Sequence, residues 1–237
     1  MQVGLFPVQL VNEEPTSGTK HNPPIGWDAS GTKYVIKCNK QHKHLALIEW
    51  LSYQLCRACG IPTPVFEIIR RVDGSIAFGI RWEDDAEQIN EHMQHAVSLN
   101  LLAVHHAAIS STLALDGFLP NIDRNAGNFL FVRRSGATIC LSIDYSMSGP
   151  RMYEPPKTPF GTWPMPPGTT TFKLYPHLPG GKALTTSTDR VNAALKAITK
   201  NQFQATLESA PEEWFEDLPL QDLLDWWDNE ATTRLQI

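Results

Sequence analysis

Alternation of apolar and polar residues dominates the first part of the chain and predicts short strands. An alternating, β-branched run covers residues 32–38, and a shorter run covers residues 7–11. Two further runs, over residues 65–71 and 75–82, flank Asp73-Gly74, a dipeptide typical of a tight hairpin turn. These patterns predict a small antiparallel β-sheet near the N-terminus.

A helical period interrupts the strands once. Leu45, Ile48, Leu51 and Leu55 recur every three or four residues, which predicts a helix over residues 43–59. The glycine and two prolines in the following Gly-Ile-Pro-Thr-Pro segment favour a helix end there. The inserted helix therefore lies between strands of the same sheet.

The rest of the chain reads as mostly helical. Beyond an acidic segment over residues 83–87, we predict helices over residues 92–115, 191–200, 202–210 and 218–235, and a second hairpin from runs 129–132 and 138–143. Residues 149–181 hold nine of the 18 prolines and five of the 15 glycines, so we expect a long packed loop there. The sequence thus predicts an α+β fold.

Composition excludes several classes of protein. With 42% hydrophobic residues and seven tryptophans in 237 residues, the chain is expected to be globular rather than disordered. A net charge of -5 provides no general attraction for nucleic acid or for an anionic membrane. We see neither a secretory signal nor an apolar run of 18 residues, so we expect a cytoplasmic protein without a membrane span. Its four cysteines are then expected to be reduced and buried, including the Cys56-x-x-Cys59 pair inside the predicted helix.

The segment LPNIDRNAGN, residues 119–128, lies between the predicted helix and the second hairpin. Asp123 is followed five residues later by Asn128, and the hairpin ends at Asp144. This spacing is typical of the catalytic machinery of protein kinases. Phosphoryl transfer needs a carboxylate near the attacking hydroxyl, the expected role of Asp123, and hard oxygen ligands for magnesium, the expected role of Asn128 and Asp144. Alone, the Asp and Asn would be read as ordinary turn formers.

The N-terminal half supplies complementary candidates. Lys37 lies on a predicted strand between apolar neighbours and could reach nucleotide phosphates, while Glu49 on the next helix could pair with it. Glu49 could equally be an exposed helix residue. The small residues Ser17, Gly18 and Thr19 form a candidate phosphate loop, since they let backbone amides approach phosphate oxygens.

Several motifs in order resemble one known family. YVIKC, LIEWLSYQLCRACGIPTP, FGIRW, IDRNAGNFLF, LSIDYS and LESAPEEWF, spread over residues 14–217, are similar to segments of the HipA-like kinases, bacterial relatives of eukaryotic protein kinases. The chain reads Asn-Ile-Asp at residues 121–123 and Asp-Tyr-Ser at 144–146, where eukaryotic kinases carry His-Arg-Asp and Asp-Phe-Gly. The HipA-like pattern accommodates both departures.

The resemblance implies a bilobal, protein-kinase-like fold with ATP and Mg²⁺ in the cleft. Residues 1–85 would form an N-lobe of antiparallel sheet and one helix, and residues 86–237 a mostly helical C-lobe. Asp123 would be catalytic, Asn128 and Asp144 would bind the metal, and Lys37 would anchor ATP. The backbone around Arg81, Trp82 and Glu83 would form the hinge that reads adenine. Ser17 is the candidate for the phosphate-loop serine that is often autophosphorylated in larger members.

Three functions follow from these expectations. The first is a kinase that phosphorylates serine or threonine on a protein, with the proline-rich loop at the substrate mouth. The family likeness adds a toxin role, a target among translation components and a small antitoxin-type protein partner. The second is a kinase for an inositol lipid or a small hydroxyl compound, which the absence of a basic amphipathic helix disfavours. The third is a nucleotide-binding module without turnover.

Overall fold

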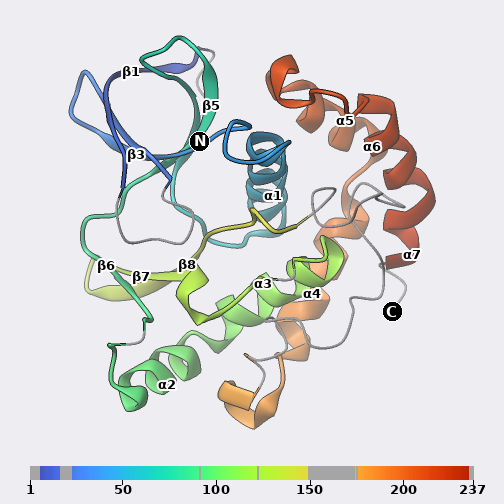
Figure 1. Cartoon of the computed structure of the whole chain (residues 1–237). Coiled ribbons are helices and arrows are strands. Elements are labelled where there is room, and N and C mark those ends of the chain that lie inside the picture. The colour runs from blue at the N-terminus through green and yellow to red at the C-terminus, as the bar shows by residue number, and fades with distance from the viewer. Residues whose placement is uncertain are drawn as a thin grey trace.

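The computed structural model describes residues 6–16, 23–90, 92–121, 123–148, 174 and 176–234, and its architecture is mixed α+β (Figure 1). The strands are β1 (Val8–Glu14), β2 (Ile25–Asp28), β3 (Lys33–Lys37), β4 (Phe66–Arg70), β5 (Ile76–Arg81), β6 (Ala86–Gln88), β7 (Phe129–Arg134) and β8 (Ala137–Ser142). The α-helices are α1 (Leu45–Cys59), α2 (His95–Val104), α3 (His106–Phe118), α4 (Thr185–Ala197), α5 (Lys200–Glu208), α6 (Leu220–Trp226) and α7 (Thr232–Arg234). A π-helical turn, η6 (Trp227–Ala231), joins α6 to α7, and the 3-10 turns include η1 (Ala126–Asn128), η4 (Pro179–Gly181) and η5 (Glu212–Trp214).

The N-terminal strands form a closed barrel in the order β1-β2-β3-β5-β4. Neighbouring strands are antiparallel except β1 and β4, which pair in parallel at Val8–Ile69 and Gln9–Arg70. The prediction of a small antiparallel sheet was therefore wrong about its closure. The barrel interior is filled by side chains that alternate along the strands: Leu10, Tyr34, Ile36, Cys38, Ile69 and Ala77.

Local sequence signals placed β3, α1, β4 and β5 correctly, whereas β2 was not predicted. Helix α1 ends at Gly60, whose φ of 67° is a left-handed conformation that glycine adopts without steric cost. The Asp73-Gly74 dipeptide joins β4 to β5 as an antiparallel hairpin, with Gly74 at φ 82°. The first strand is longer than expected and runs to Glu14.

Two features of the middle of the chain differ from the prediction. Residues 86–88 form β6, which pairs with β7 in a second sheet of order β6-β7-β8. The single helix expected over residues 92–115 is two helices, α2 and α3, with a bend of 79° between them. Among the helices of the described residues none is by itself long and apolar enough to cross a membrane; α2 and α3 reach that length and apolar composition only when taken together.

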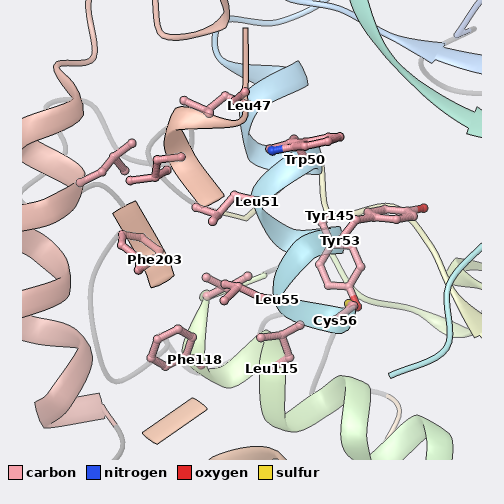
Figure 2. Close-up of a cluster of buried hydrophobic side chains, with 14 of the residues drawn as sticks. Leu47, Trp50, Leu51, Tyr53, Leu55, Cys56, Leu115, Phe118, Tyr145 and Phe203 are labelled. Atoms are coloured by element: carbon pink, nitrogen blue, oxygen red, sulfur yellow. The ribbon is translucent and has the colours of Figure 1, made fainter. Parts of the chain in front are cut away.

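Helix α1 lies at the centre of the largest hydrophobic core, between the barrel and the C-terminal helices (Figure 1). In Figure 2, Leu51 and Leu55 point toward the helix that carries Phe203, whereas Trp50 and Tyr53 lie on the other side of α1. Trp50 and Tyr53 pack edge-on against the barrel residues Phe66 and Phe78. Because α1 is enclosed on both sides, its position is set by barrel and C-terminal helices together.

All four cysteines are buried and reduced. The Sγ of Cys56 lies 3.0 Å from the hydroxyl of Tyr145, and burial raises the pKa of Cys59 to about 12. Such thiols are protonated at neutral pH and poorly nucleophilic. The Cys56-x-x-Cys59 pair is thus part of the core.

Candidate functional site

Three chain segments meet at the ammonium group of Lys37. Lys37 is the last residue of β3, and its Nζ lies 3.2 Å from Oδ1 of Asp144 and 3.6 Å from Oε1 of Glu49. The side chain of Glu49 is fully buried, and that of Asp144 is 32% exposed. The structure thus joins a strand, a helix and the end of a hairpin into one charged cluster, which contains three of the residues singled out in the sequence.

The electrostatics of this cluster are those of one cation shared by two carboxylates. Burial would lower the pKa of Lys37, but Asp144 and Glu49 outweigh burial and raise it. Burial raises the pKa of Glu49 to about 7, and Lys37 only partly opposes this shift. Burial alone would raise the pKa of Asp144 as well, yet Lys37 and the hydrogen bond from Ser146 hold it at about 2. Asp144 is therefore ionised at neutral pH, whereas Glu49 titrates near neutrality.

Glu49 also connects α1 to the segment that follows β8. Its Oε2 accepts a hydrogen bond of 3.3 Å from the backbone N–H of Tyr145. The hydroxyl of Tyr145 in turn lies 2.7 Å from the hydroxyl of Ser142. Asp144 itself has a φ of 59°, a left-handed conformation that aspartate and asparagine adopt more readily than most residues. The backbone around Asp144 is thus tied to α1, and Nδ2 of Asn121, in the loop that follows α3, donates to the carbonyl of Asp144 at 3.5 Å.

That loop holds the other two candidates. Asp123 is half-buried, its backbone N–H donates to Oδ1 of Asn121 at 3.3 Å, and its carboxylate accepts no hydrogen bond from the described residues. Asn128 ends η1, where its Oδ1 accepts from the backbone N–H of Asn125 at 3.2 Å. The carbonyl of Asn128 accepts from the N–H of Ile143, so Asn128 and Asp144 are held at one end of the β7–β8 hairpin.

A buried ion pair that sequence reasoning missed supports this loop. Arg124 and Asp116 are both fully buried, and the guanidinium donates to both carboxylate oxygens of Asp116, at 2.7 and 3.0 Å. The same guanidinium donates to the carbonyls of Asn128 and Ile143. It also lies 4.5 Å from the ring of Tyr145. One signal could have revealed the pair: Asp116 is an acid within the apolar run LALDGF, where burial requires a partner.

The outer face of β3 extends from Lys37 toward the predicted hinge. Because side chains alternate along a strand, Lys33 and Val35 share the face of Lys37. The backbone N–H of Trp82 donates to the carbonyl of Lys33 at 2.8 Å, and the Lys33 ammonium lies 3.9 Å from the Trp82 ring. The row of side chains on this face, which runs from Lys37 through Val35 to Lys33, therefore ends at Trp82, beside the end of β5.

The other hinge candidates are placed differently. Arg81 alternates to the opposite face of β5 and is exposed, so only its backbone is near the row. Glu83 forms an ion pair of 2.6 Å with Arg134 of β7, which connects the segment after β5 to the second sheet. Ser17, Gly18 and Thr19 lie outside the described residues, as does most of the proline-rich loop.

The donor set beside Asp144 fits a hard divalent cation. Asp144 contributes an ionised carboxylate and Asn128 a neutral amide oxygen, and both atom types are ligands that Mg²⁺ prefers. The Oδ1 of Asn128 keeps a second lone pair beyond its bond to Asn125. The chemistry of these two residues is thus consistent with a magnesium site.

Comparisons with known proteins agree on the fold. No protein-family model matches the chain, and no curated protein matches its sequence. A crystal structure of the Helicobacter pylori proinflammatory kinase CtkA is similar with a TM-score of 0.59 and 12% identity, over 94% of each chain. HipA of the Shewanella oneidensis MR-1 toxin-antitoxin system, in a complex with HipB and operator DNA, is similar with a TM-score of 0.51 and 10% identity, over 90% of this chain and 57% of HipA. The chain has the fold of HipA-like kinases, in agreement with the resemblance of its motifs.

Proposed function

We propose that this protein is a kinase that uses ATP and Mg²⁺ to phosphorylate a serine or threonine hydroxyl of a protein. The observation that carries the proposal is the position of Lys37, within 3.6 Å of Glu49 and 3.2 Å of Asp144. Three elements far apart in sequence converge there on the residue types that phosphoryl transfer needs. The kinase fold of the neighbouring structures supports the same activity.

In this proposal the nucleotide lies between two lobes, residues 1–85 and residues 86–237. Lys37 binds the α and β phosphates, and the face from Val35 to Trp82 takes the base. Bound Mg²⁺, held by Asn128 and Asp144, would neutralise phosphate charge. The residues Ser17, Gly18 and Thr19 would cover the phosphates.

The reaction assigns a distinct role to Asp123. Its half-buried carboxylate orients the acceptor hydroxyl and takes its proton. The hydroxyl oxygen forms a bond to the γ phosphorus as the bond to the β–γ bridging oxygen breaks, and ADP leaves. Asp123 suits this role because no hydrogen bond from the described residues occupies its carboxylate.

Transfer of labelled γ-phosphate tests the proposal. We expect label on the protein itself or on an acceptor in a cell lysate, and phosphoamino-acid analysis should find phosphoserine or phosphothreonine. Asp123→Asn should lower the transfer rate at least about 10²-fold, the usual contribution of a positioned general base, with an unchanged melting temperature. The proposed reaction would be excluded if Asp123→Asn transferred phosphate at the wild-type rate, or if the label appeared only on lipids.

The pH dependence of transfer should report on Glu49. Its pKa of about 7 means that the ion pair with Lys37 forms as the pH rises through neutrality, so transfer should be half-maximal near pH 7 and level off at higher pH. Stability changes in the opposite direction. The pKa of Glu49 is about 7 in the folded state and 4.5 in the unfolded state, so between these pH values the folded state binds the proton more tightly. The free energy of unfolding therefore falls as the pH rises from 4.5 to about 7. In Glu49→Gln both the rise in rate and this part of the stability loss should disappear. A variant that keeps the wild-type pH profile would show that another group titrates.

The partner is proposed by analogy with the Shewanella structure, in which HipA is bound to HipB and operator DNA. We propose a small antitoxin-type protein as a binding partner. Co-purification of this protein with the product of any adjacent reading frame would test for such a partner.

A further inference from the structure

A short C-terminal segment, residues 212–217, contacts the elements that hold Lys37 and Glu49. We call it the clamp segment; it comprises η5 and the three residues that follow. Trp214 at its centre is 1% exposed, and its ring packs edge-on against Trp50 of α1 at 6.1 Å between centroids. Trp50 is the residue after Glu49, so the clamp segment lies directly against the turn of α1 that carries the carboxylate.

Trp214 also forms two polar contacts across the core. Its Nε1–H donates to the carbonyl of Ile76 in β5 at 3.3 Å, and its own carbonyl accepts from Nδ2 of Asn39 at 3.1 Å. Asn39 follows β3, and its Oδ1 accepts from the N–H of Ala46 in the first turn of α1 at 3.1 Å. One residue thus connects β5, the β3–α1 loop and α1.

The clamp segment also contacts the residues just before α1 at the protein surface. Asp217 lies 2.5 Å from Nζ of Lys43 and 3.1 Å from Nε2 of His44, the two residues before α1. Asp217 is 68% exposed, so this contact contributes little to stability. The buried contacts of Trp214 therefore hold α1 more strongly.

We propose that Trp214 is a positioning residue that keeps α1 where Glu49 meets Lys37. The pairing distance of 3.6 Å depends on how far α1 lies from the barrel, and Trp214 and Asn39 connect α1 to β5 and to the loop that follows β3. The inference rests on the proposed function for its effect on catalysis, but the geometry of Lys37 can be measured without activity.

Chemical labelling of Lys37 is the first test. Trp214→Phe keeps an aromatic ring beside Trp50 and removes the donor to Ile76. Trp227→Phe is the matched control, because it trims another buried indole of the same core, one that stacks on Phe203 at 4.1 Å. Asn39→Ala removes the link to α1 without altering the core, which keeps the test valid if Trp214→Phe unfolds.

We expect acetic anhydride to label Lys37 several-fold faster in Trp214→Phe and in Asn39→Ala, because displacement of α1 would expose an ammonium group whose side chain is only 11% exposed in the wild type. Trp227→Phe should label like the wild type. Equal labelling in all folded variants would overturn the proposal. If labelling responds but the wild type transfers no phosphate from any nucleotide, the positioning role holds and the kinase assignment fails.

A double-mutant cycle separates positioning from general destabilisation. If Trp214 acts through the ion pair, Trp214→Phe should lower kcat between about 10- and 100-fold, as misplacement of a catalytic group does, and should add little in a Glu49→Gln background. The KM for ATP should change less than kcat. Fully multiplicative losses in the double variant would contradict the proposal.

Discussion

Asp144→Asn should lower the rate of phosphate transfer at least about 10³-fold below that of the wild type, since the metal ion that Asp144 is proposed to bind would supply several kcal/mol of charge stabilisation. The carboxylate is ionised because Lys37 and Ser146 hold its pKa at about 2. Asparagine has the same shape but no charge, so it neither balances Lys37 nor binds a cation strongly. The measurement is transfer of labelled γ-phosphate at saturating ATP.

The choice of asparagine matters because residue 144 has a φ of 59°. Asparagine adopts this left-handed conformation readily, whereas alanine would add backbone strain and confuse a catalytic loss with misfolding. Circular dichroism should show the wild-type spectrum, and Lys37 keeps Glu49 as a partner. A transfer rate within tenfold of the wild type, in a folded variant, would remove Asp144 from the proposed metal site.

Local chemistry made much of the fold predictable. Alternation over β3, the helical period of α1 and the Asp73-Gly74 turn each depend on neighbours in sequence, and each element appears where it was expected. The convergence of Lys37, Glu49 and Asp144 was also expected, but only from the order of several motifs. A single strand lysine or helix glutamate would not have indicated it.

Long-range pairing is what the sequence did not reveal. The parallel contact between β1 and β4 closes the barrel through residues about 60 positions apart, and no turn signal marks such a contact. The strand β6 is only three residues long and has the sequence Ala-Glu-Gln, which has a low β-propensity. Its conformation therefore depends on its pairing with β7. The bend between α2 and α3 lies at His105, within a run of strong helix formers.

The Asp116–Arg124 pair shows the same limit at the site. Arg124 stands in a polar loop, where exposure is the ordinary expectation for arginine, yet it is fully buried. Its four hydrogen-bond acceptors come from Asp116, Asn128 and Ile143, so the pair joins the end of α3 to the open end of the β7–β8 hairpin. Asp123 and Asp144 each lie one residue from a group in this network, which therefore sets their separation.

Arg124→Met should destabilise the protein by about 3–5 kcal/mol, because it leaves the carboxylate of Asp116 buried without its cation. Burial already raises the pKa of Asp116, with Arg124 as the main opposing influence. Without Arg124 the folded state favours the protonated acid, so the loss should shrink as the pH falls and grow as the pH rises. Urea unfolding followed by circular dichroism at several pH values measures both effects.

The double variant Asp116→Leu with Arg124→Met distinguishes stability from positioning. Apolar replacement of both partners of a buried ion pair is often neutral for stability, so we expect most of the lost free energy of unfolding to return. Phosphate transfer should remain low, because the carbonyls of Asn128 and Ile143 still lack the guanidinium that holds the loop of residues 119–128 against the hairpin. Full recovery of transfer together with stability would mean that the pair only supports the fold; recovery of stability alone would show that Arg124 orients the loop that carries Asp123.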